Sequence, residues 1–265
     1  MNFSDAAAVL AEPKTNNISK RAQSVESFKV MDVLCRANEL QAQGRTIYHC
    51  EVGQPESGAP ETVAKAALAS LTGPPREVMG YTDAFGLIEL RSQIAKHYMD
   101  KYPTFPSERV DVKNIVVTTG SSGGFLLTFT ACFDTGDIVA VASSGYPCYR
   151  NILSALGCKI ATIPINEHFK LTAKELSHEI QRRNDSNEVP LKGLILSSPS
   201  NPTGSMLNPD ELKELCELCD AEGIQFISDE IYHGISYGSV PEATALQYSD
   251  KVIVINSFSK YYSSK

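Results

Sequence analysis

Residues 193–229 read GLILSSPSNPTGSMLNPDELKELCELCDAEGIQFISD, and this stretch decides the fold. It contains two short apolar runs, at 193–197 and 225–228, and neither run alternates with polar residues. Such runs are typical of strands that are buried on both faces of a sheet. The stretch therefore predicts two buried strands joined by a longer connection.

The connection carries the signals of a helix over residues 208–222. Asn208 can cap the N-terminus, and Glu211 can complete a capping box with it. Pro209 suits the first helical position, and Gly223 can end the helix. A strand, a helix and a second strand in this order predict a parallel βαβ unit.

The same alternation extends over much of the chain and predicts an α/β fold with a mostly parallel sheet covered by helices. Ligands bind at the carboxyl ends of such strands, so the residues after each strand are candidates for a site. The predicted strands are 114–119, 137–142, 159–165, 193–197, 225–228 and 251–256. The predicted helices are 25–43, 60–71, 86–100, 125–133, 172–183 and 208–222.

Composition excludes several classes of protein. The 265 residues are 42% hydrophobic, which is enough to bury a core, and the net charge of −7 argues against a nucleic-acid partner. The longest apolar runs are strand-sized and too short to cross a bilayer. Seven cysteines form no evident paired framework, which favours a reducing, cytoplasmic location. Residues 1–24 lack the apolar core of a secretory signal and are expected to form a polar arm.

Two loops follow predicted strands and contain small or turn-forming residues. The loop TTGSSGG at 118–124 opens a helix, where backbone N–H groups and hydroxyls can hold a phosphate, but it also suits a tight structural turn. The loop SPSNPTG at 198–204 suits a Pro/Gly turn, and the Asn201 amide within it can both donate to and accept from a ligand hydroxyl.

Two charged residues also stand at strand ends. Asp229 needs a partner if it is buried, and either a protonated ring nitrogen or a lysine or arginine could supply one. Lys260 follows the run 251–256, where it is either a solvated surface charge or an amine with a lowered pKa for imine chemistry.

The other reactive residue types predict no metal site. Cys216 and Cys219 lie within the helix 208–222 without a second pair, so core packing is favoured over zinc or redox chemistry. The five histidines, His233 among them, share no ligand spacing and receive no role.

Taken together, these motifs resemble the fold-type I pyridoxal 5′-phosphate (PLP) enzymes, specifically the class I and II aminotransferases. The resemblance implies a three-layer α-β-α large domain at 59–265, preceded by a segment of a small domain at 25–58. The motifs are EVGQP at 51–55, GYTDAFG at 80–86 followed by ELR at 89–91, the Gly120 loop, YPCY at 146–149, NPTG at 201–204, DEIY at 229–232 and SFSK at 257–260.

The resemblance implies a role for each matching residue around the cofactor ring. Lys260 would form a Schiff base with PLP and later move the substrate proton. Asp229 would face the pyridine nitrogen, and Asn201 and Tyr232 would hydrogen-bond the phenolic oxygen. Tyr146 would stack on the ring, with ordinary core packing as the alternative. Catalysis would thus rest on Lys260, Asp229 and Tyr232.

Further roles concern the phosphate, the substrate and a partner subunit. Gly53, with Asn201, would lie by the substrate carboxylate, because glycine leaves room for close backbone approach. Tyr81 would reach across a homodimer to the neighbour's phosphate. The implied phosphate-binding residues within the chain are Gly120, Ser121, Ser122, Ser257 and Ser259.

The implied activity is transfer of an amino group from an amino acid to a 2-oxo acid. A PLP-dependent lyase or a cyclopropane-forming synthase uses the same lysine and aspartate and stays an alternative. The sequence reads YYSSK after Lys260, where the family continues towards a phosphate-binding arginine, a final strand and a C-terminal small domain. A chain that is truncated relative to the family is therefore expected, and an inactive remnant is a further alternative.

Overall fold

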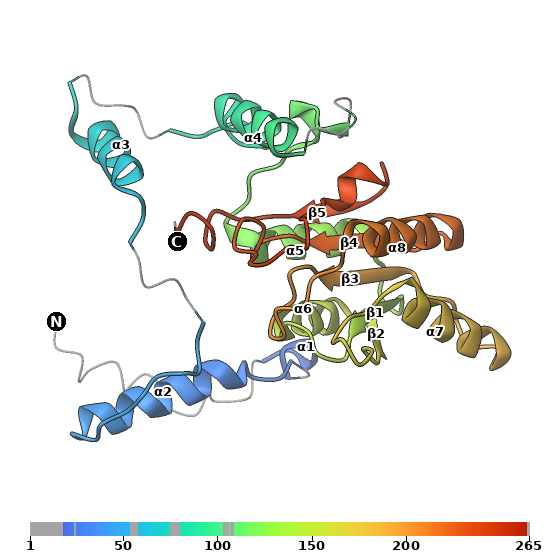
Figure 1. Ribbon diagram of the computed structural model, residues 1–265. Helices are drawn as coiled ribbons and strands as arrows, with labels where there is room; N and C mark the ends of the chain where they lie inside the picture. The colour runs from blue at the N-terminus through green and yellow to red at the C-terminus, as the bar shows by residue number, and fades with distance from the viewer. Residues whose placement is uncertain are drawn as a thin grey trace.

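The computed structural model describes residues 18–23, 25–53, 58–74, 80–102, 106 and 109–263. Its centre is a five-stranded sheet in the order β2-β1-β3-β4-β5, and every neighbouring pair of strands is parallel (Figure 1). This arrangement confirms the predicted α/β fold. The strands are β1 (Ile138–Ala142), β2 (Lys159–Ile163), β3 (Gly193–Ser197), β4 (Gln225–Asp229) and β5 (Ile253–Ile255).

Helices cover both faces of the sheet. Side chains alternate along a strand, so Ala140 of β1 packs towards α7 and α8, while Val139 packs towards α5 and α6. The sheet therefore has a hydrophobic core on each side, as burial of every residue of β1 and β3 requires. The covering helices are α5 (Gly120–Cys132), α6 (Pro147–Leu156), α7 (Ala173–Asp185) and α8 (Pro209–Glu222).

Two helices that cover the sheet begin as their sequences predict. At α8, the Asn208 side chain accepts from the Glu211 N–H at 2.9 Å, and the Asn208 N–H donates to Glu211 Oε2 at 2.8 Å. Gly223 follows α8 with a φ of 67°, a backbone conformation that favours glycine. Thr172 and Glu175 form the same capping box at α7. Both capping boxes are confirmed.

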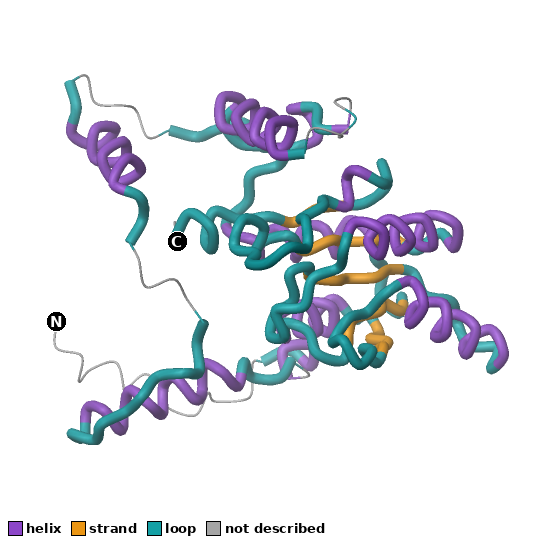
Figure 2. Tube along the Cα trace, viewed as in Figure 1, coloured by secondary structure: helices purple, strands orange, loops and turns teal. Residues whose placement is uncertain are grey.

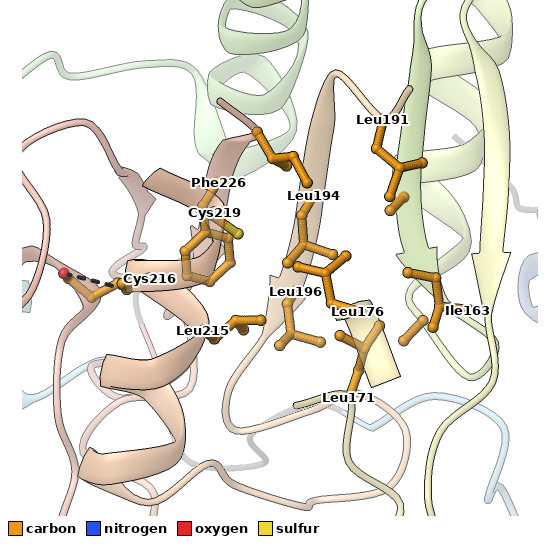
Figure 3. Close-up of a cluster of buried hydrophobic side chains, with 14 of the residues drawn as sticks. Ile163, Leu171, Leu176, Leu191, Leu194, Leu196, Leu215, Cys216, Cys219 and Phe226 are labelled. Atoms are coloured by element: carbon orange, nitrogen blue, oxygen red, sulfur yellow. Dashed lines mark hydrogen bonds between the residues drawn. The ribbon is translucent and has the colours of Figure 1, made fainter. Parts of the chain in front are cut away.

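Cys216 and Cys219 lie in the core, as the sequence indicates. Figure 3 shows both side chains among leucines of the sheet and helices, and each is about as buried as the strand residues. Burial raises the pKa of the Cys216 thiol to about 12. Within the described part of the chain, no group of three His, Cys, Asp or Glu residues could hold a metal ion. Packing is the role that the structure gives this C-x-x-C motif.

The predicted strand at 114–119 is wrong. Residues Val112–Asn114 form the short 3-10 helix η4, and residues 115–118 then form neither a helix nor a strand of the sheet. Val117 donates its N–H to the Phe85 carbonyl at 3.0 Å, which is a loop contact and not part of a strand ladder. A β-branched apolar run needs a neighbouring strand to become a strand, and none of the described segments supplies one here.

Two helix predictions also need correction. Helix α5 begins at Gly120 and not at residue 125, because the small-residue loop itself takes up the helical conformation. Helix α6 was not predicted at all, although Pro147 stands at its first position and Gly157 ends it with a φ of 83°. Pro147 and Gly157 were usable start and stop signals.

Within the described residues, four α-helices precede α5 in the chain. They are α1 (Lys20–Gln23), α2 (Lys29–Ala42), α3 (Glu61–Thr72) and α4 (Ile88–Lys101). Helix α1 packs against α6, and the Tyr98 hydroxyl of α4 accepts from Asn256 Nδ2 at 2.9 Å. Helices α2 and α3 bury none of their residues and extend away from the sheet (Figures 1 and 2). Helix α2 starts at Lys29 rather than at 25, and most of the predicted arm 1–24, namely residues 1–17 and 24, lies outside the described residues.

One further short helix, η5 (Ala245–Gln247), packs near β5. Among the helices that the structure describes, none is both long enough and apolar enough to span a membrane.

Candidate active site

The candidate residues lie around the carboxyl ends of the central strands. Asp229 is the last residue of β4, and Asn201 and Lys260 follow β3 and β5. Since β3, β4 and β5 are parallel neighbours, their carboxyl ends meet at one edge of the sheet. The topology thus brings together residues that are distant in the sequence.

Asp229 is the buried carboxylate of this site, with 1% of its surface exposed. The Ile231 N–H donates to its Oδ1 at 3.2 Å, and the Tyr149 hydroxyl donates to its Oδ2. Burial raises the pKa of Asp229 to about 6, against the lowering effect of these hydrogen bonds and of Lys260. Within the described residues, the carboxylate therefore accepts hydrogen bonds from a phenol and a backbone amide.

Tyr149 was not recognised in the sequence, although a signal for it existed. It stands on α6, three residues after Tyr146, and this spacing places two side chains on one side of a helix. Burial, followed by the charge of Asp229, raises the pKa of Tyr149 well above its ordinary value, so the phenol keeps its proton and donates it.

Asn201 and Tyr232 form a second polar element. The Asn201 Nδ2 donates to the Tyr232 hydroxyl at 3.1 Å. Lys260 Nζ lies 5.6 Å from the centre of the Tyr232 ring, and its charge acts on Asp229. The structure therefore brings the amide, the phenol, the amine and the carboxylate into one site, while their roles there stay predictions.

Tyr146 packs beside these groups at the start of α6. Its ring meets the rings of Tyr149 and Phe28 edge to face, with centroid distances of 5.7 Å in both pairs. Burial raises its pKa, and the charge of Asp229 adds to that effect. Tyr146 thus lies against the site, while its stacking on a cofactor ring stays a prediction.

The glycine loop at the start of α5 has the features of an anion site. The first N–H groups of a helix have no carbonyl partner within the helix, and those of Ser121 and Ser122 belong to this first turn. A Cβ at Gly120 would meet no atom within 4 Å, whereas one at Gly124 would meet Thr118 Oγ1 at 3.3 Å. Gly124 therefore serves close packing, and space is open at Gly120.

Further polar side chains of the candidate set stand on α5, on α6 and in the turn after β5. Ser122 Oγ lies 3.9 Å from Cys148 Sγ. Burial raises the pKa of the Cys148 thiol, and the charge of Asp229 adds to this effect. Ser257 Oγ and Ser259 Oγ are 2.7 Å apart just before Lys260. Both serines are thus placed by the same turn that places the lysine.

Gly53 and Tyr81 are not brought to this site in the structure. Tyr81 is fully exposed at 107% of its reference surface, and a Cβ at Gly53 would meet no atom within 4 Å. Gly53 lies between α2 and α3 in the chain and Tyr81 lies between α3 and α4, and α2 and α3 extend away from the sheet (Figure 1). The roles of Gly53 and Tyr81 at the substrate and in a partner subunit stay predictions.

Comparison with known proteins gives a consistent family. The family model described as aminotransferase class I and II matches residues 50–265. A valine–pyruvate aminotransferase of Mycobacterium tuberculosis is 45% identical over 94% of this chain and 61% of its own length. A (5-formylfuran-3-yl)methyl phosphate transaminase of Methanocaldococcus jannaschii is 34% identical over 92% of this chain and 60% of its own length.

A solved structure agrees with this family. The crystal structure of an aminotransferase from Mycobacterium tuberculosis superimposes with a TM-score of 0.84 at 45% identity, and covers 94% of this chain and 61% of that one. The chain therefore spans about three fifths of the length of the proteins that it matches.

Proposed function

The chain belongs to the class I and II aminotransferase family, and from this premise we propose that its site binds PLP for amino-group transfer between an amino acid and a 2-oxo acid. The observation that carries the proposal is the buried Asp229 carboxylate, next to the Asn201–Tyr232 pair and to Lys260. Each of these groups matches a different functional group of one cofactor.

The donors and acceptors of the site fit PLP. A buried carboxylate with a raised pKa is stabilised by a cationic ring N–H, which Asp229 would accept as a hydrogen bond. The Asn201 amide and the Tyr232 phenol are already hydrogen-bonded to each other and would both reach a phenolic oxygen. Lys260 supplies the amine for covalent attachment.

Bound PLP would supply a ring that accepts the electrons left when the substrate Cα–H bond breaks. Asp229 would hold the proton at the ring nitrogen, which keeps the ring electron-poor. Lys260 Nζ, as a free amine, would take the proton from the substrate α-carbon and give it to C4′ of the cofactor. Tyr146 would cover one face of the ring and exclude water there.

The phosphate would bind where the glycine loop and the turn before Lys260 meet. We assign it to the backbone of Gly120, the first-turn N–H groups and hydroxyls of Ser121 and Ser122, and the hydroxyls of Ser257 and Ser259. Ser259 already bonds to Ser257, so it would reach the phosphate by rotating or by orienting Ser257.

The remaining roles depend on a second subunit and on the substrate. We propose a homodimer in which the fully exposed Tyr81 contacts the partner's phosphate site, and we assign Gly53 to the substrate carboxylate. Valine with pyruvate is the first substrate pair to test, since these are named for the relative with 45% identity. All seven cysteines are free, which supports a reducing compartment such as the cytoplasm.

The direct test is an amino-transfer assay of the purified chain with PLP, valine and pyruvate, followed by other amino acids with 2-oxoglutarate or oxaloacetate. We expect a new amino acid and a 2-oxo acid in equal amounts, and no product from the Lys260→Ala variant. Lys251→Ala removes an exposed lysine on the approach to β5 and should retain activity. Release of ammonia instead of a new amino acid would contradict the proposal.

A further inference from the structure

His233 lies directly behind the site and joins three segments of the chain. It is 7% exposed and follows Tyr232 by one residue. Its Nε2 is 3.0 Å from the Ser198 carbonyl oxygen, and its Nδ1 is 2.6 Å from the Tyr102 hydroxyl. The sequence pattern predicts no role for this histidine, but in the structure both of its ring nitrogens have a partner.

The two partners determine which ring nitrogen of His233 carries the hydrogen. A carbonyl oxygen only accepts hydrogen bonds, so Nε2 must carry the hydrogen that bonds to Ser198. In the neutral ring, Nδ1 then accepts from the Tyr102 hydroxyl. The orientation of the imidazole is therefore fixed from both ends.

Glu230 anchors the other side of this arrangement. Its Oε1 accepts from the Ala245 N–H at 2.9 Å and from the hydroxyls of Thr244 and Ser228 at 3.1 and 3.2 Å. Its Oε2 lies 3.5 Å from His233 Nδ1 and has no hydrogen bond within the described chain. These three hydrogen bonds hold the Glu230 carboxylate in a fixed position beside the imidazole.

Ser198 begins the loop that carries Asn201. Its N–H donates to the Asp229 carbonyl at 3.1 Å, and its hydroxyl accepts from the Leu207 N–H at 3.0 Å. With the His233 bond to its carbonyl, all three polar groups of Ser198 are held. Three residues later, Asn201 donates to the Tyr232 hydroxyl.

We propose that His233 is a positioning residue, which holds the loop from Ser198 to Gly204 so that the Asn201 amide stays on the Tyr232 hydroxyl. The inference rests on the proposed function, because it assigns His233 to the same cofactor site. His233 acts through Ser198 and does not touch the cofactor. A histidine that only filled the core would need no hydrogen bond at either ring nitrogen. The positioning role requires that Nε2 donates to the Ser198 carbonyl.

Hydrogen exchange of the chain without cofactor tests the loop directly. In His233→Leu we expect roughly tenfold faster exchange for peptides that contain the Ser200 and Gly204 amides, and unchanged exchange in β1. His233→Gln keeps a side-chain N–H donor at similar reach and should restore protection. His178→Leu removes an exposed histidine on α7 and should change nothing in the loop.

Unchanged loop exchange in His233→Leu, or equal loss of protection in the loop and in β1, would overturn the inference. If His233→Leu does not fold, Tyr102→Phe takes its place, because it removes the hydroxyl that orients the imidazole at Nδ1 and so frees Nε2 to turn away from the Ser198 carbonyl. Faster exchange in the loop alone is then expected, and an unchanged loop contradicts the proposal.

Titration with PLP separates the inference from the proposed function. We expect His233→Leu and Asn201→Ala to weaken PLP binding to a similar degree, and the double variant to be no weaker than Asn201→Ala alone. Fully additive effects would show that His233 does not act through Asn201. Failure of the unmodified chain to bind PLP would overturn the proposed function, and the exchange result would still decide whether His233 holds the loop.

Discussion

The sheet and the N-terminal helices both contain many apolar side chains, but they bury them to different extents. Every residue of β1 and β3 is buried, whereas α2 and α3 bury none. Leu68 and Leu71 of α3 are as apolar as Leu194 of β3, and yet they face outward. A side chain stabilises the fold only where another element covers it, so stability is concentrated in the sheet.

The candidate site follows the same division. The groups that meet in the structure are carried by the sheet strands, the loops after them, and α5 and α6, while Gly53 and Tyr81 belong to the N-terminal region and stay apart. The two regions touch near the site, where Phe28 packs on Tyr146 and the Asn151 side chain donates to the Glu26 carbonyl at 3.2 Å. Rigid packing behind a site is what keeps its groups in place.

The largest effect is expected from a cavity in the sheet core. Phe129 of α5 is 0% exposed, and Phe129→Ala should lower the free energy of unfolding by about 4 kcal/mol. The matched change in α3 is Leu68→Ala at 61% exposure, and it should stay within about 0.5 kcal/mol. Urea denaturation of both variants measures the difference, and equal losses would refute the division between the two regions.

The next effect concerns the buried carboxylate of the site. Folding raises the pKa of Asp229 from 3.8 to about 6, so the folded chain binds more protons than the unfolded chain between these values. Stability should therefore decrease as the pH rises from 4 to 7, by about 3 kcal/mol at most from this group. In the chain without cofactor, Asp229→Asn should remove the share of this pH-dependent loss of stability that comes from Asp229.

Urea denaturation at several pH values checks this prediction. Asp250→Asn is the control, since Asp250 is exposed and should leave the pH dependence as it is. If the stability of the Asp229→Asn variant depends on pH as strongly as that of the original chain, burial does not raise the pKa of Asp229 in the folded chain.

A smaller effect is expected at the helix caps. Asn208→Ala removes the side chain that accepts from the Glu211 N–H and should cost about 1 kcal/mol. Asn38→Ala changes the same residue type at an exposed position inside α2, where alanine is the better helix former. Thermal unfolding should therefore show a lower midpoint for the first variant and no loss for the second.

The smallest effect is expected where the two regions touch. Phe28→Ala removes the edge-to-face contact with Tyr146, and the loss should be about 0.5 kcal/mol. Phe28→Leu keeps apolar contact and should lose less. A loss as large as that of Phe129→Ala would mean that the N-terminal region supports the sheet core after all.

The sequence predicted those parts of the fold whose signals are local. Unbroken apolar runs located all five strands of the sheet, and the capping boxes at Thr172 and Asn208 located α7 and α8. The run 114–119 has the same composition as the strands and still does not join the sheet. Its conformation depends on whether a neighbouring strand is present, and no local pattern contains that information.

The same limit applies to the site. Asp229, Asn201 and Lys260 became candidates because each stands at or after the end of a predicted strand, whereas Tyr232 became one only through the resemblance to the family. Tyr149 and His233 could not be assigned in this way, because their partners, Asp229 and the Ser198 carbonyl, are known only once the chain is folded. Gly53 and Tyr81 lie in the segments next to α2 and α3, and these two helices bury none of their residues.

The measurement that tests the central claim most directly is reduction of the PLP-treated chain with borohydride, followed by peptide mass mapping. If this chain assembles the cofactor site, the pyridoxyl group will be found on Lys260, and Asn201→Ala will lower its yield. Labelling spread over surface lysines such as Lys251, with no preference for Lys260, would contradict the account.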